Sequence, residues 1–164
     1  MIKNIIFFLL LNFLLSSCSN DPDIVKTFVT QEGLPIEQSH EVKIIQTEHG
    51  LIKIKLEAEK VERFIDPKEI LKLSNGLRVE FYNDSIELIS VLLAETAILD
   101  QKTEIMEAKN NVVLEGKDGN KLESEELTWD LKKDLIFTDK KVTITIDQDI
   151  IHGYGFESKS DFSS

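Results

Sequence analysis

The sequence contains two stretches that resemble each other, AETAILDQKTEIMEAKNNVVL at residues 94–114 and SEELTWDLKKDLIFTDKKVTI at residues 124–144. They align without a gap at an offset of 30 residues. The aligned pairs include Glu95 with Glu125, Leu99 with Trp129, Asp100 with Asp130, and Val112 with Val142. A unit of this length cannot bury its own apolar face, so the repeat predicts stacked units that share one elongated core.

Apolar and polar residues alternate with period two around this repeat, most clearly at residues 52–58, 77–81 and 142–146. This alternation predicts β-strands that are apolar on one face. The stretch 86–100 resembles a helix at first, but its apolar residues keep an even parity and indicate a strand. Turn-forming residues are expected to separate the strands at 49–50, 74–76, 83–84, 110–111, 118–120, 148–149 and Gly153.

The N-terminal segment has the pattern of a signal peptide. Lys3 precedes an apolar run from Ile5 to Leu15, which is too short for a membrane-spanning helix. The run ends in Leu15-Ser16-Ser17-Cys18, which resembles a bacterial lipobox. We therefore expect cleavage after residue 17, lipid attachment at Cys18, a linker over residues 18–40 and a folded domain over residues 41–162. The alternative is a buried cysteine behind an ordinary signal peptide; no second cysteine is present to form a disulfide.

Charge and motif content exclude several functions. Without residues 1–17 the chain has 18 basic and 30 acidic residues, a net charge of −12, which disfavours nucleic acid as a partner. Carboxylate pairs such as Glu125-Glu126 are inevitable among so many acids, and the three histidines lack the spacing of a metal site. With no nucleophile elbow or phosphate-binding loop, we expect no enzyme activity, no catalytic residue, no metal and no cofactor.

Six segments of the sequence together form a recognisable order of motifs: 76–82 (GLRVEFY), 92–95 (LLAE), 111–114 (NVVL), 118–122, 125–130 and 151–158. In these segments the chain resembles the LptC family of lipopolysaccharide-export proteins. The resemblance implies an all-β fold, an elongated open β-jellyroll of stacked antiparallel strands, with lipid A acyl chains held in a hydrophobic groove. Many members keep an uncleaved transmembrane helix, and the predicted lipobox departs from that pattern.

The resemblance also implies partners and a location. Lipopolysaccharide would arrive from the jellyroll subunits of an inner-membrane ABC exporter (LptF/LptG type) and pass to an LptA-like bridge protein. The N-terminal edge at 42–47 would meet the exporter, and the C-terminal edge at 150–158, with Gly153 and Gly155, would meet the bridge protein. A turn and a bulge are the alternative interpretation of these glycines. The expected location is the periplasmic face of the inner membrane, with the outer membrane as the alternative.

Ten apolar residues are candidates to line the groove: Ile54, Leu56, Val79, Phe81, Val112, Leu114, Trp129, Phe137, Val142 and Ile144. Ordinary core packing is the alternative for each of them, and Trp129 is favoured to fill a core layer because it aligns with Leu99. Lipid A is anionic, so an acidic chain would bind it through acyl burial at about 0.8 kcal/mol per methylene, with the phosphates left in solvent. The competing hypothesis is a structural or interaction envelope lipoprotein whose core is filled and takes no lipid.

Overall fold

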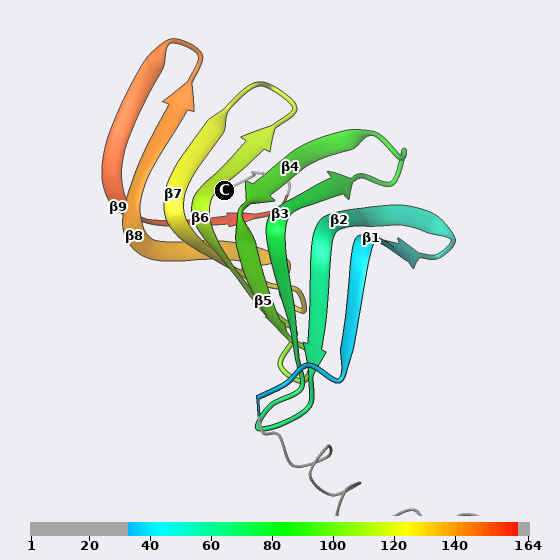
Figure 1. Ribbon diagram of the computed structural model, residues 1–164. Helices are drawn as coiled ribbons and strands as arrows, with labels where there is room; N and C mark the ends of the chain where they lie inside the picture. Colours follow the sequence, from blue (N-terminus) through cyan, green and yellow to red (C-terminus); the bar gives the residue numbers. More distant parts are fainter. Residues whose placement is uncertain (1–32, 161–164) are drawn as a thin grey trace, which may run out of the picture. The chain divides into compact units, whose positions relative to one another are not determined.

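The computed structural model describes residues 33–160, which form strands and no helix (Figure 1). The strands are β1 (Glu37–Glu48), β2 (Leu51–Phe64), β3 (Ile70–Tyr82), β4 (Leu88–Ala94), β5 (Thr96–Asp100), β6 (Ile105–Gly116), β7 (Lys121–Asp130), β8 (Leu135–Ile146) and β9 (Asp149–Lys159). Within this range no helix is long and apolar enough to cross a membrane. The all-β prediction is confirmed, including strands β4 and β5 where a helix was the alternative.

The structure describes only part of the chain for which we predicted segment boundaries. Strand β1 begins at Glu37, inside the segment that we predicted to be linker. The predicted signal peptide, Cys18 and most of the linker lie outside the described residues.

All nine strands of the described range belong to one antiparallel sheet with the order β1-β2-β3-β4-β6-β7-β8-β9. Strands β4 and β5 occupy one position in this order, separated only by Glu95: β4 pairs with one end of β3 and β6, and β5 pairs with the other end. The sheet therefore ends in two border strands, β1 and β9, each paired on one side in the described part of the chain.

Each of the longer strands is interrupted near its middle by a register shift or by a residue with positive φ, and β4 and β5 are separated at the same level by Glu95. The interruptions lie at Glu41, at 58–60, at Asn75 and Gly76, between β4 and β5, at Asn110 and Asn111, at 124–128, at 138–141 and at Gly155. Because a bulge bends its strand, this row bends the whole sheet over itself. We call the part that carries the turns at 49–50 and 83–87 the upper wall, and the part that carries the turns at 65–69, 101–104 and 131–134 the lower wall (Figure 1).

The structure corrects three of the predicted turns. Residues 74–76, 110–111 and Gly153 lie inside β3, β6 and β9 and do not connect strands. Asn75, Gly76, Asn110 and Asn111 have positive φ, a conformation that bulges share with turns. The same residue types therefore signal either structure.

Two turns of the lower wall explain why Asp100 and Asp130 align in the repeat. One Asp100 carboxylate oxygen accepts hydrogen bonds from the backbone N–H groups of Lys102 (3.0 Å) and Thr103 (2.9 Å). Asp130 accepts one from the backbone N–H of Lys133 at 3.0 Å and forms an ion pair with the ammonium of that lysine at 3.1 Å. The repeat thus encodes two equivalent turns that are closed by aspartate side chains.

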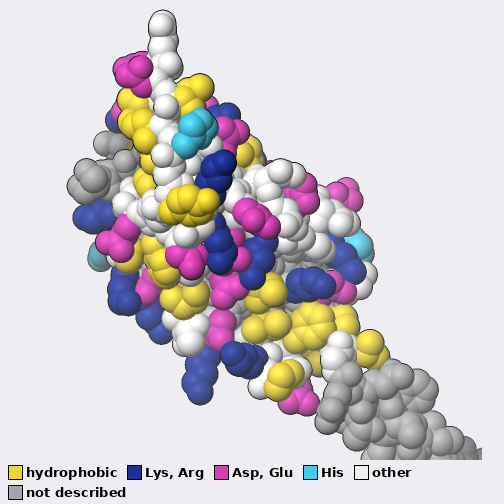
Figure 2. Space-filling model, turned by 90° about the vertical axis from the view of Figure 1, so that its left-hand side faces the viewer, with side chains coloured by type: hydrophobic (Ala, Val, Ile, Leu, Met, Phe, Trp, Pro, Cys, Tyr) yellow, Lys and Arg dark blue, Asp and Glu magenta, His cyan; other side chains and the backbone are white. Residues whose placement is uncertain are grey.

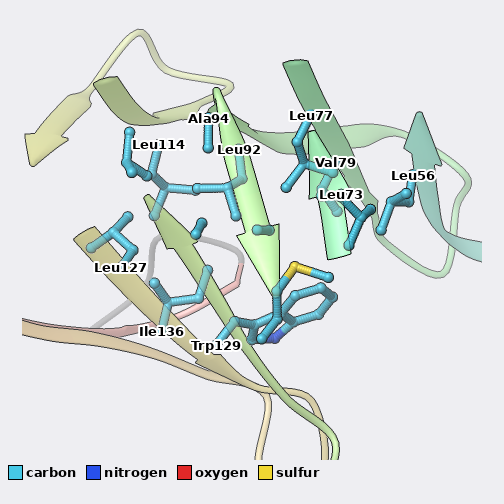
Figure 3. Close-up of a cluster of buried hydrophobic side chains, with 14 of the residues drawn as sticks. Leu56, Leu73, Leu77, Val79, Leu92, Ala94, Leu114, Leu127, Trp129 and Ile136 are labelled. Carbon is cyan, nitrogen blue, oxygen red and sulfur yellow. The ribbon is translucent and has the colours of Figure 1, made fainter. Parts of the chain in front are cut away.

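The strand register places one apolar row across the whole upper wall. Successive directly paired residues, from β1 to β9, are Ile44, Leu56, Val79, Leu92, Leu114, Leu122, Ile144 and Ile151. A corresponding row in the lower wall contains Leu71, Leu99, Met106, Trp129, Ile136 and Ser158. The two rows contribute to a single buried cluster between the walls (Figure 3).

The bend predicts different responses from two glycines. A Cβ added at Gly76 or at Gly153 would meet no atom within 4 Å, but only Gly76 has positive φ (109°). Gly76→Ala is expected to lower the free energy of unfolding by about 1–2 kcal/mol because of backbone strain alone. Gly153→Ala is the matched control and should cost nothing, which urea unfolding of the full chain would measure. Equal effects of the two changes would contradict the proposed role of the bend.

The aspartate turns predict an acid-dependent stability. The backbone N–H of Thr103 lowers the pKa of Asp100, and the hydrogen bond from the Lys133 ammonium lowers the pKa of Asp130. Lowered pKa values stabilise the fold above the ordinary aspartate pKa of about 3.9, and this stabilisation is lost as the pH falls through the lowered values. The double variant Asp100→Asn with Asp130→Asn should be less stable than the wild type at pH 7, and the difference should shrink in acid. A difference that stays constant down to about pH 2 would contradict this account.

Candidate functional site

The apolar row of the upper wall changes from buried to exposed along its length. Val79 and Leu114 in the middle are 0% exposed, whereas Ile44 on β1 is 42% exposed and Ile151 on β9 is 51% exposed. The inner surface of the sheet is therefore apolar from one border strand to the other. We call this surface the groove: it is filled in the middle and open at both borders.

The two walls touch directly at an aromatic pair. The rings of Phe81 in β3 and Trp129 in β7 lie 4.9 Å apart at 78°, an edge-to-face contact. Phe81 belongs to the upper wall and Trp129 to the lower wall, both near the ends opposite the bend. The indole N–H of Trp129 is buried and has no hydrogen-bond partner among residues 33–160. Side chains therefore close the groove at this contact.

A cavity of about 400 Å³ lies beside this aromatic contact. Its apolar lining consists of Ile54, Phe81, Ile89, Trp129 and Leu131. Its polar lining consists of Gln46, Glu48, Lys53, Tyr82, Asn83, Asp84, Asp134 and Ser160, among which Lys53 and Asp84 form an ion pair. The cavity, which we call the mouth cavity, therefore combines an apolar patch with a larger set of polar and charged side chains.

The structure places nine of the ten candidate residues on the inner face. Buried there are Leu56, Val79, Phe81, Val112, Leu114, Trp129 and Val142, and half-buried are Ile54 and Ile144. The prediction that Phe137 also lies on the inner face must be corrected. It pairs with Thr128, whereas its neighbour Ile136 pairs with Trp129, so Phe137 lies on the outer face and is 37% exposed.

The sequence patterns did not select several inner residues. They are Ile44, Ile89, Leu92, Leu122 and Ile151. Leu92 and Leu122 lie in two segments that carry the family resemblance, 92–95 and 118–122, and are 30 residues apart like the aligned pairs of the repeat, which was a signal that could have selected them. Ile44 and Ile151 stand in pairs with Ile45 and Ile150, and a pair of adjacent isoleucines does not show which one faces inward.

The glycines of the C-terminal edge have different geometries. Gly155 has a φ of 78° at the bend of β9, and a Cβ there would lie 3.8 Å from the backbone oxygen of Thr138. Gly153 pairs with Val142 in regular register. The bend accounts for Gly155 as a bulge, while a role of either glycine in partner contact stays a prediction.

A family comparison adds to this geometry. The family model described as Lipopolysaccharide-assembly, LptC-related, matches residues 6–161, nearly the whole chain. The chain belongs to the LptC-related family. Membership assigns it to lipopolysaccharide transport in the cell envelope, in a family of transport components that is not known for enzyme activity. No curated protein matches the chain.

The outer face of this LptC-related chain is polar where the groove is apolar. Lys55 lies 4.7 Å above the ring of Tyr82, whose hydroxyl donates to Glu80 at 2.6 Å. This hydrogen bond, together with Arg78, lowers the pKa of Glu80. Figure 2 shows charged side chains of both signs interspersed with hydrophobic ones on the face in view. Among residues 33–160 no group of three or more His, Cys, Asp or Glu residues could hold a metal ion.

The placement of two phenylalanines can be tested by truncation. Phe81→Ala removes a ring that is 2% exposed and contacts Trp129, so it should lower the free energy of unfolding by about 3–5 kcal/mol. Phe137→Ala, the outer-face control, should cost less than about 1 kcal/mol. Because Trp129 is the single tryptophan of the chain, its fluorescence should change in the first variant only. A larger cost at Phe137 would show that the faces of β8 are assigned wrongly.

Proposed function

We propose that this protein receives lipopolysaccharide from an inner-membrane exporter and passes it to an LptA-like bridge protein, with the acyl chains bound along the groove. The observation that carries the proposal is the apolar row of the upper wall, which runs in register from one border strand to the other. If a sheet with a similar apolar row paired with either border strand, the two rows would form one continuous apolar surface. Family membership supports the same function.

The open ends of the groove are the best places for acyl chains. At the β1 end, Ile44 is exposed, and Val42 and Ile54 are only partly buried. The mouth cavity adjoins this end. Each methylene that leaves water contributes about 0.8 kcal/mol, so a few methylenes bind favourably even though the chain is acidic. The phosphates would stay outside in solvent, because the nearby Lys53 is already paired with Asp84.

The border strands offer a way to bind the two protein partners. A free strand edge presents unpaired backbone N–H and C=O groups, which a partner strand can pair with. We assign the β1 edge, residues 42–47, to the exporter's jellyroll and the β9 edge, residues 150–158, to the bridge protein. Both edges carry exposed apolar side chains, including Ile45 (57%) and Tyr154 (81%), which suit a site that a partner covers.

We further propose that a lipid on Cys18 anchors the mature chain to the periplasmic face of the inner membrane. The apolar run of residues 5–15 and the following Leu15-Ser16-Ser17-Cys18 support this assignment. Density-gradient fractionation of cells distinguishes it from an outer-membrane location. A Cys18→Ser variant should incorporate no labelled fatty acid and should keep residues 1–17.

A second candidate function is supported by the filled middle of the groove. Leu92, Leu114, Leu122 and Ile136 are at most 1% exposed, as expected of an ordinary core. In this second function the protein is an interaction scaffold of the envelope, and its border strands bind partners while its interior takes no lipid.

Adjacent isoleucines provide a matched test between these functions. Ile44 and Ile45 are both exposed, but the register places Ile44 opposite Leu56 on the inner face and Ile45 opposite Lys55 on the outer face. Ile151 and Ile150 form the same kind of pair on β9, opposite Ile144 and Thr145. A photo-crosslinking residue at 44 or 151 should capture lipopolysaccharide in cells, and one at 45 or 150 should not. Crosslinks of equal strength on both faces, or on neither, would favour the scaffold.

A further inference from the structure

The C-terminal end of β9 reaches the side of the groove that lies opposite the bend, beside the mouth cavity. We call this side the mouth of the groove. Ser158 pairs with Ile136 across β8 and is only 6% exposed. Ser160 follows the end of the strand, is 7% exposed and lines the mouth cavity together with Phe81 and Trp129. In Figure 1 the red end of β9 accordingly runs inward across the view, away from the border. Serine residues are mostly exposed in folded proteins, so the burial of these two requires a reason.

That reason is a hydrogen bond across the mouth. Ser90 lies on β4 directly opposite Phe81 and is 0% exposed. Its hydroxyl donates a hydrogen bond to the backbone oxygen of Ser160, 70 residues further along the chain. Ser90 belongs to the upper wall, and the end of β9 pairs with the lower-wall part of β8. This bond therefore joins the walls at a second point, beside the contact between Phe81 and Trp129.

We propose that residues 158–160 are a displaceable latch that competes with the acyl ligand for the mouth of the groove. This inference rests on the proposed function and adds a regulation to it. Ser160 forms part of the wall of the mouth cavity, so an acyl chain that extends from the cavity further between the two walls must displace the latch. Opening the mouth also exposes the indole N–H of Trp129, a donor for which the described part of the chain supplies no partner while the mouth is closed.

The position of the latch on β9 links it to partner binding. The same strand forms the C-terminal border, where residues 150–158 are assigned to the bridge protein. A partner strand that pairs with this border and straightens β9 at Gly155 pulls the latch from Ser90. Ligand release and partner docking are then coupled through one strand.

The test uses the full chain in cells with a photo-crosslinking residue at Ile54, which lines the mouth cavity and is half-buried. Lipopolysaccharide capture is compared in three backgrounds: wild type, Ser90→Ala and Ser124→Ala. The Ser124 hydroxyl also donates to backbone oxygens, those of Lys141 (3.1 Å) and Glu126 (3.2 Å), but Ser124 lies at the register shift between β7 and β8, so it is the matched control. Ser90→Ala should raise capture about threefold or more, the effect of losing one hydrogen bond, and Ser124→Ala should not.

A second variant fixes the latch in place. Ser90→Cys with Ser160→Cys should form a disulfide in the oxidising periplasm and abolish capture at Ile54, and a reductant should restore capture. Capture that is equal in all backgrounds, including the oxidised double variant, overturns the latch and leaves the proposed function intact. Absence of capture at Ile54, Ile44 and Ile151 in every background overturns the proposed function, and the latch with it.

Discussion

The row of bulges and positive-φ residues across the middle of the sheet is the constraint on which the rest of the structure depends. An antiparallel sheet with one apolar face must cover that face, and this chain does so by bending its own sheet through Asn75, Gly76, Asn110, Asn111 and Gly155. Both walls of the interior are therefore halves of the same strands. Because the sheet is bent and not closed into a barrel, β1 and β9 remain as free borders in the described part of the chain.

Bending one sheet also determines where the interior is dry. A middle strand has covered neighbours on both sides, so residues such as Val79 and Leu114 are completely buried, while the same row at Ile44 and Ile151 is exposed. The burial gradient follows from strand order alone and needs no special residue at the ends. An exposed apolar row and a free strand edge then occur at the same places, which is the combination that the proposed lipid transfer requires.

The strands, their apolar faces and the repeat could be predicted from the sequence because each depends on local spacing. Asn75 and Asn110 were misread as turns, since positive φ serves a turn and a bulge equally well. Phe137 was assigned to the wrong face because three apolar residues, Leu135 to Phe137, occur in succession and hide the parity of β8. The contacts between Phe81 and Trp129 and between Ser90 and Ser160 depend on the distance between walls, which no local pattern contains.

A filled middle and a lipid-binding role are compatible because the walls are joined unequally. At the bend they are held by the continuous backbone of every strand, whereas away from the bend they are held by side chains alone, those of the buried cluster with an aromatic pair and a serine hydroxyl. The opening that we propose would therefore separate side chains and break no strand pairing apart from the last residues of β9. An acyl chain that entered would replace the apolar contacts that this opening removes. The mouth is thus the part of the sheet where exchange of a side chain for a lipid chain disturbs the fold least.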